Sequence, residues 1–198
     1  MNITAEQVKA LRDKTGAGFM ECKAALVEAK GAIEEATTIL RKRGLAQAAK
    51  RAGRSTGQGT IGSYIHMGKV GVLVEVNCES DFVARTEDFQ ALAKELAMQV
   101  AASSPLYARR EDVPAEVIER EKAIYRAQLE GSKKPAGVIE KIVEGKLESF
   151  FEQVVLLDQP SIRDPKITVG QMIQATIAKV GENITAPRFA RLKVGESA

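Results

Sequence analysis

The sequence has few of the residues on which most catalytic and metal centres depend. Its 198 residues include one histidine, two cysteines and no tryptophan. Any His-containing catalytic triad or multi-histidine metal site would therefore depend on His66 alone. The two cysteines, Cys22 and Cys78, provide neither a disulfide framework nor a paired metal motif. This composition favours a reducing, cytoplasmic setting, and it points to no catalytic residue, metal or cofactor.

Long apolar runs and a strong charge bias are also absent. No run approaches the ~20 residues that a membrane helix needs, and MNITAEQVKALR has no apolar signal core, so we expect a mature, cytoplasmic protein. The net charge is +3, which permits an acidic partner surface. Aromatic residues make up 5% of the chain, and none interrupts the basic runs 50–54 and 109–110, whereas nucleic-acid modules add base-stacking aromatics. We expect neither membrane contact nor direct nucleic-acid contact.

The first 50 residues predict a small helical module. Residues 1–44 contain three apolar stripes with helical spacing, which end near Gly16, Gly31 and Gly44. Isolated helices this short are marginal in water, so the three must share one core. A Gly/Ser/Thr-rich stretch follows and has the composition of a linker. We therefore predict a three-helix module at 1–50, a linker at 51–59 and a second domain at 60–198.

Residues 60–198 predict an α+β fold, with a small three-stranded antiparallel sheet packed against about four helices. IGSYIHM and VGVLVEVN flank Gly68-Lys69, which is typical of a tight β-hairpin. In the tail RFARLKV, Ala190, Leu192 and Val194 alternate with charged residues, as in a half-buried strand. Helices are expected to begin near Glu87, Pro114, Pro135 and Thr168.

Two motifs could carry chemistry, and each has a simpler explanation. GQGTIG, residues 57–62, matches the dinucleotide-binding pattern, but a basic helix precedes it and a strand follows, which is the wrong context. Acids crowd the stretch NCESDFVARTEDF, residues 77–89, which could in principle hold a divalent cation or a hydrolytic carboxylate pair. It lacks the sharp-turn glycine of calcium loops, and Glu87 and Asp88 suit the first turn of a helix.

Phe82 is the unusual residue of that acidic stretch. The ring could cover the core beneath the predicted hairpin, or it could be exposed and anchor a partner, because a few aromatic residues dominate most interfaces. The residues alone favour a ring that covers the core and leave the exposed anchor open as the alternative. They also leave open an RNA- or ribosome-binding protein that acts through the basic linker, and a metal-dependent hydrolase built on the acids.

Four segments resemble the short form of bacterial elongation factor Ts. They are LRDKTGAGFMECKAAL (11–26), EVNCESDFVARTEDF (75–89), IGSYIHMGKVGVLVEV and TVGQMI, and the similarity runs over essentially the whole chain. The resemblance implies a ubiquitin-associated-like three-helix module, a linker and an α+β core. Ser80 stands where the family often has threonine, and Phe19 where it often has methionine.

The resemblance also implies a function. The family consists of guanine nucleotide exchange factors for the GTPase elongation factor Tu, which act by binding and not by catalysis. An Asp-Phe pair inserts near the magnesium site of the GTPase, so that GDP leaves. Short members are expected to form homodimers. By position match, the residues implied at the magnesium site are Ser80, Asp81, Phe82 and Val83, and those implied at other contacts are Lys9, Arg12, Met20, Lys23 and His66.

Overall fold

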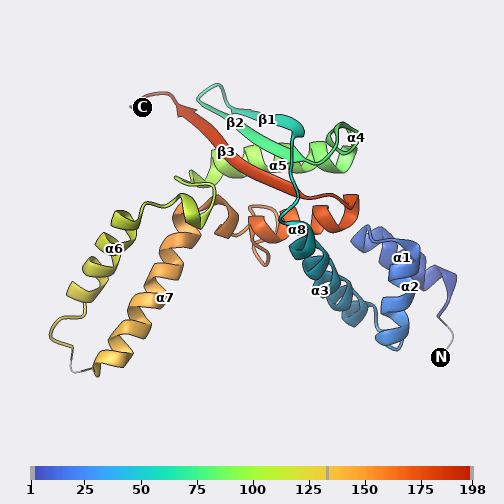
Figure 1. Cartoon of the computed structure of the whole chain (residues 1–198), viewed down its shortest axis with the longest axis horizontal. Coiled ribbons are helices and arrows are strands. Elements are labelled where there is room, and N and C mark those ends of the chain that lie inside the picture. Colours follow the sequence, from blue (N-terminus) through green and yellow to red (C-terminus); the bar gives the residue numbers. More distant parts are fainter. Residues whose placement is uncertain (1–2, 133, 197–198) are drawn as a thin grey trace. The chain divides into compact units, whose positions relative to one another are not determined.

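The computed structural model describes residues 3–132 and 134–196. Over this part the chain is α+β, with eight α-helices and one antiparallel sheet in the order β1-β2-β3, as predicted (Figure 1). The chain divides into two compact units, each built from three separate segments. The first unit comprises Met1–Thr60, Val76–Leu92 and Gln171–Thr185, and the second comprises Ile61–Glu75, Ala93–Gly170 and Ala186–Ala198.

Three helices open the first unit: α1 (Ala5–Thr15), α2 (Phe19–Glu28) and α3 (Ile33–Arg51). A capping box starts α1, in which the Gln7 amide donates to Thr4 Oγ1 at 3.2 Å and the Thr4 amide donates to Gln7 Oε1 at 3.0 Å. The apolar stripes meet as predicted in one shared core, which contains Val8, Leu11, Cys22, Ala25, Leu26, Ala29, Ala36 and Leu40.

Helix α3 continues through Gly44, so the prediction that it ends there is wrong. A Cβ atom on Gly44 would lie 3.1 Å from the Cβ of Ala178 in α8 (Val169–Val180), within the same unit. The glycine thus permits close approach between two helices, and this packing overrides the local stop signal. After α3 ends at Arg51, the connection to the first strand is short, because β1 begins at Gln58.

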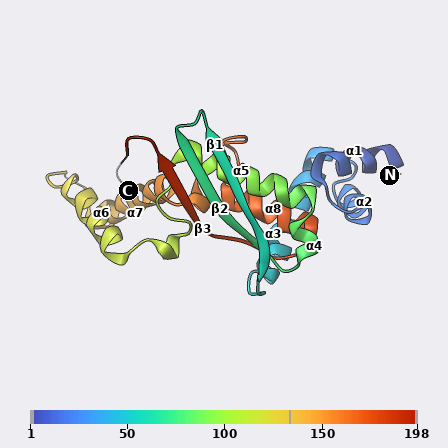
Figure 2. The same ribbon diagram turned by 90° about the horizontal axis from the view of Figure 1, so that it is seen from above.

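The predicted hairpin is confirmed, but the two central residues of its turn are Met67 and Gly68 and not Gly68 and Lys69. Strands β1 (Gln58–His66) and β2 (Val70–Cys78) are joined by a turn in which the Lys69 amide donates to the His66 carbonyl at 2.9 Å. Met67 and Gly68 both have positive φ, 49° and 67°, as the two central residues of a type I′ turn require. Helix α5 (Glu87–Ser103) lies against one face of the strands (Figure 2), and within the second unit Gly62 of β1 lies against Ala93 of this helix.

Strand β3 (Ile184–Lys193) starts before the predicted segment, and its exposed side is the opposite of the one expected. Ile184 and Ala186 are buried, but beyond Pro187 the alternation changes phase, and Leu192 is 73% exposed. A proline cannot donate to the ladder and is tolerated at edges and bulges, which fits this edge strand. Ala190, Leu192 and Val194 are therefore exposed, whereas Phe189 and Arg191 are half-buried.

The remaining helices begin close to the predicted positions. In the second unit, α6 (Ala115–Ala127) and α7 (Ala136–Val154) contact each other, and short 3₁₀ turns occur at Arg110–Asp112 and Leu156–Asp158. A second apolar cluster, around Phe151 and Val155, lies at the end of α7. Within 3–132 and 134–196, no helix is both long and apolar enough to cross a membrane.

A candidate docking turn

A single helical turn, α4 (Asp81–Ala84), follows β2 in the first unit. Ser80 is its N-cap, with extended backbone, and its Oγ accepts a hydrogen bond from the Val83 amide at 3.4 Å. Ala84 is buried and fixes the other end of the turn. The sequence Ser-Asp-Phe-Val-Ala thus folds locally into a capped turn that begins directly after a buried strand.

Phe82 projects from this turn and is 80% exposed. Its neighbours Asp81 and Val83 are half-buried. The alternative in which the ring covers the core is therefore wrong, and the sequence could not have excluded it. An exposed phenyl ring leaves apolar surface in water, and a partner that covers it gains the free energy of burying that surface.

The acids around the turn have separate partners. Asp81 Oδ2 accepts from Arg85 Nη2 at 2.9 Å, one helical turn along. Glu79 Oε1 accepts from the Asn183 amide at 2.7 Å. In the described part of the chain, no group of three or more His, Cys, Asp or Glu residues is placed to hold a metal ion. The acidic stretch is divided among local contacts and does not form a cage.

Glu182, between α8 and β3, contacts the start of the turn with both carboxylate oxygens. The Ser80 amide donates to Oε2 at 2.9 Å, and the Ser80 hydroxyl donates to Oε1 at 2.6 Å. On the other side, the Cys78 thiol donates to the Ser80 carbonyl at 3.1 Å. Burial raises the pKa of the Cys78 thiol, and the nearby Glu182 carboxylate raises it further.

Sequence reasoning assigned no role to Glu182 or Asn183. Their partners are about a hundred positions away in the chain, and a single sequence carries no direct signal for such pairings. The available signal was local: Gly-Glu-Asn, residues 181–183, separates a helix from a strand, which is where polar loop residues position functional groups.

The predicted contact residues of the helical module are all exposed. Lys9 and Arg12 lie on α1, and Lys23 and Met20 lie on α2, where Met20 is 70% exposed. Val27, 59% exposed and seven positions after Met20, extends this face and was missed. Its spacing from Met20 was the signal that could have identified it, because residues at i and i+7 share one helix face.

His66 lies in the second unit, at the end of β1 beside the hairpin turn. Its side chain is exposed, and its Nδ1 atom is 3.0 Å from the hydroxyl oxygen of Tyr64, two residues earlier on the same strand. This placement leaves the other edge of the ring accessible to a partner.

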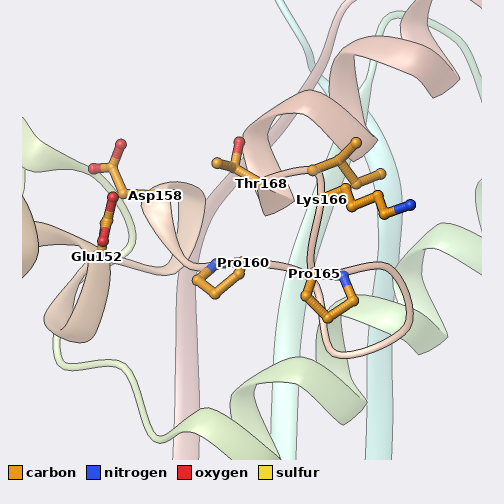
Figure 3. A pocket seen from close by; sticks show the side chains of 7 residues that line it. Glu152, Asp158, Pro160, Pro165, Lys166 and Thr168 are labelled. Carbon is orange, nitrogen blue, oxygen red and sulfur yellow. The ribbon is translucent and has the colours of Figure 1, made fainter.

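A shallow cleft of about 260 Å³ occurs elsewhere in the second unit (Figure 3). Its lining includes the carboxylates of Glu152 and Asp158 and, across the opening, Lys166. Asp158 is already paired with Arg110, whose Nε donates to its Oδ2 at 2.8 Å. None of the predicted site residues lines this cleft.

The first unit therefore presents an aromatic ring on a fixed turn, and separately an exposed face of mixed basic and apolar residues on α1 and α2. These are the features of a protein that docks on another macromolecule. The family model described as elongation factor TS matches residues 1–196. The chain belongs to the elongation factor Ts family, and its role is that of a translation elongation factor.

Curated relatives agree over nearly the full length. The chain is 60% identical over 197 residues to elongation factor Ts of Koribacter versatilis, covering 99% of this chain and 90% of the relative. It is 58% identical to that of Fervidobacterium nodosum, covering 99% of this chain and all of the relative. It is 60% identical to that of Thermosipho melanesiensis, covering 98% of this chain and all of the relative.

Proposed function

We propose that this protein is a guanine nucleotide exchange factor that binds elongation factor Tu·GDP and promotes release of GDP, so that GTP can bind. The observation that carries the proposal is the exposure of Phe82 on a capped turn, in the segment that resembles the family's Asp-Phe motif. In this proposal Ser80, Asp81, Phe82 and Val83 enter the magnesium and phosphate-binding region of the GTPase and weaken its hold on GDP.

Exchange of this kind needs binding free energy and no covalent chemistry. The protein lowers the affinity of the GTPase for GDP by some factor. By linkage, GDP must lower the affinity of the GTPase for the protein by the same factor. The protein accordingly acts without a catalytic residue, metal or cofactor of its own, and it is not an enzyme. We place its activity in the cytoplasm, with the GTPase as its partner and no direct contact to nucleic acid.

The size of the effect requires more than one side chain. A thousandfold loss of GDP affinity corresponds to about 4 kcal/mol, whereas burial of one phenyl ring supplies ~1.5–3 kcal/mol. Phe82 therefore acts together with further contacts. The exposed residues on the helical module supply them in this proposal, with His66 as a contact from the second unit, and the members of the set are Lys9, Arg12, Met20, Lys23 and His66.

The test is stopped-flow release of fluorescent GDP from elongation factor Tu, with wild-type protein and Phe82→Ala. Because the ring is exposed, the variant should keep the wild-type melting temperature while GDP release at saturating protein slows at least tenfold, which is about 1.4 kcal/mol. Leu106→Ala is the matched control, since Leu106 is 68% exposed and lies outside the proposed site. If GDP release with Phe82→Ala is as fast as with wild-type protein, the ring has no part in the mechanism.

We also propose a homodimer, formed through the outer face of the sheet in the second unit. Gly62 and the buried Val72 and Val74 face α5, so the alternate positions point away from it. Arg188 Nε donates to Glu75 Oε2 at 2.5 Å, which places β3 side chains on this outer face. Its exposed apolar residues are Ile61, Ile65, Leu73 and Leu192.

Three other large apolar residues are less suited to a dimer contact, because each is wholly or partly buried. Phe151 is buried, and Phe150 packs against the same cluster at the end of α7. Met172 is half-buried. A contiguous exposed apolar surface on a sheet is the kind of surface that marks an interaction site. The mass of the protein in solution tests the dimer directly.

A further inference from the structure

The loop between α8 and β3 contacts the docking turn in a way that local folding of the turn does not require. Both oxygens of Glu182 accept from Ser80, at 2.9 Å from its amide and 2.6 Å from its hydroxyl. Hydrogen bonds to an ionised acceptor are about twice as strong as neutral ones. The two bonds to one residue fix both the position and the orientation of Ser80, the N-cap of α4.

Asn183 extends the contact to a third segment of the first unit. Its amide donates to Glu79 Oε1 at 2.7 Å, and its Nδ2 donates to the Arg54 carbonyl at 2.9 Å, just beyond the end of α3. Asn183 is 3% exposed, so these bonds are shielded from water. The adjacent residues Glu182 and Asn183 thus join the start of the turn, the end of β2 and the segment after α3.

The turn needs such support because it is too short to hold itself. Helix α4 has four residues, and the first turn of a helix fixes several dihedrals for one hydrogen bond, which is unfavourable in isolation. Phe82 has little burial to hold its ring in place, since it is 80% exposed. The backbone of the turn therefore sets the direction of the Phe82 Cα–Cβ bond, from which the ring projects, and Ser80 holds the start of that backbone.

We infer that Glu182 is a positioning residue for exchange: it holds Ser80 so that Phe82 projects in the orientation that enters the GTPase. The inference rests on the proposed exchange function and deepens it. Preorganisation of an interface residue removes an ordering cost that would otherwise be met on binding. Loss of Glu182 should therefore reduce the productive insertion of the ring more than the overall docking of the protein.

The experiment compares Glu182→Ala, Glu182→Asp and Glu182→Gln in stopped-flow GDP release from elongation factor Tu at increasing protein concentration. Glu182→Ala should lower the maximal rate about tenfold, as expected for lost hydrogen bonds to a charged group, with little change in the half-saturating concentration. Glu182→Asp has a side chain that is one methylene shorter, so it should lose the contact with Ser80 and also lower the maximal rate of GDP release. Glu182→Gln should restore part of the rate, because its amide oxygen still accepts from the Ser80 amide and the Ser80 hydroxyl can rotate to accept, although the bonds to a neutral group are weaker.

Two further measurements separate positioning from a general loss of structure. Amide hydrogen exchange over residues 79–86 should accelerate in Glu182→Ala, while exchange in α6 and α7 stays unchanged. The matched control is Glu140→Ala, which removes a carboxylate that is paired with Arg126 of α6 and should keep the wild-type maximal rate. If Glu182→Ala fails to fold, Glu182→Asp and Glu182→Gln still provide the comparison.

The outcomes are distinct from those for the function itself. If wild-type protein accelerates GDP release and Phe82→Ala does not, but Glu182→Ala matches wild type, the positioning role is wrong and the exchange function stands. Equal loss in Glu182→Gln and Glu182→Ala would also overturn the role, because the hydrogen-bond geometry would then not matter. If wild-type protein does not accelerate GDP release at all, the exchange function is wrong. Hydrogen exchange then still tests the turn by itself: if exchange over residues 79–86 is unchanged in Glu182→Ala, Glu182 does not position the turn.

Discussion

At the scale of single residues, Asp81 contributes little to the stability of the fold. Its pairing with Arg85 is exposed, with side-chain exposures of 50% for Asp81 and 80% for Arg85, and exposed pairs contribute about 0–1 kcal/mol. Asp81→Asn should therefore change the free energy of unfolding in urea by less than about 1 kcal/mol. A carboxylate that directly contacts the GTPase should, however, slow GDP release about tenfold when it is neutralised.

Arg85→Ala provides the control for this prediction. It breaks the same ion pair and leaves the Asp81 carboxylate in place. If Asp81 acts on the partner directly, the GTPase should release GDP in the presence of Arg85→Ala at close to the rate seen with wild-type protein in the stopped-flow assay. Equal slowing in Asp81→Asn and Arg85→Ala would instead show that Asp81 acts through Arg85, and the direct contact would be wrong.

The residue scale also shows where a single sequence stops being informative. The role of Ser80 as a helix cap can be predicted from the local sequence, because its partner Val83 is three positions away. The exposure of Phe82 is not, since the same residue type suits a core or an anchor and only tertiary structure decides. The role of Glu182 is hidden for a similar reason: 102 positions separate it from Ser80.

At the scale of elements, the approach of β1 to α5 depends on one glycine. A Cβ atom on Gly62 would lie 2.4 Å from the carbonyl oxygen of Ala93, which is backbone and cannot rotate away. Gly62→Ala should therefore lower the free energy of unfolding by about 1–3 kcal/mol, as other overpacked sites do. Gly71→Ala in β2 is the control, because a Cβ there would meet no atom within 4 Å. Urea unfolding midpoints that are equal for the two variants would contradict the prediction.

The sequence predicts the types of the elements well, but it predicts where they end and which face they expose less well. The hairpin was predicted because Gly68 and the flanking apolar runs are local signals, and the α5 stripe has a clear helical period. Gly44 failed as a stop signal because α3 packs against Ala178, far along the chain. The predicted phase of β3 is wrong because the alternation of buried and exposed residues changes at Pro187, before the tail begins. Neither a local stop signal nor a local alternation carries information about the elements that pack against it.

At the scale of the whole molecule, two groups of exposed apolar residues carry the proposed interactions. Phe82 and the α2 face belong to the first unit, and the outer sheet face belongs to the second. Single exposed apolar residues are ordinary on a monomer, but four on one sheet face form a patch that water solvates poorly. The first set suits the GTPase, and the second suits another copy of the chain, so the two functions need not compete for the same residues.

The dimer makes the final prediction. Wild-type protein at micromolar concentration should scatter light with about twice the chain mass of 21.4 kDa. Leu73→Lys places a charge at the centre of the outer face, and the cost of burying an unpaired charge should give a monomer. Leu73 is 54% exposed, so the variant should fold and melt like wild type. Leu106→Lys adds the same charge outside that face and should remain dimeric. If the second copy completes the surface that docks on the GTPase, GDP release from the GTPase should also be slower with Leu73→Lys than with wild-type protein. A monomeric wild-type protein would show that the proposed dimer is wrong.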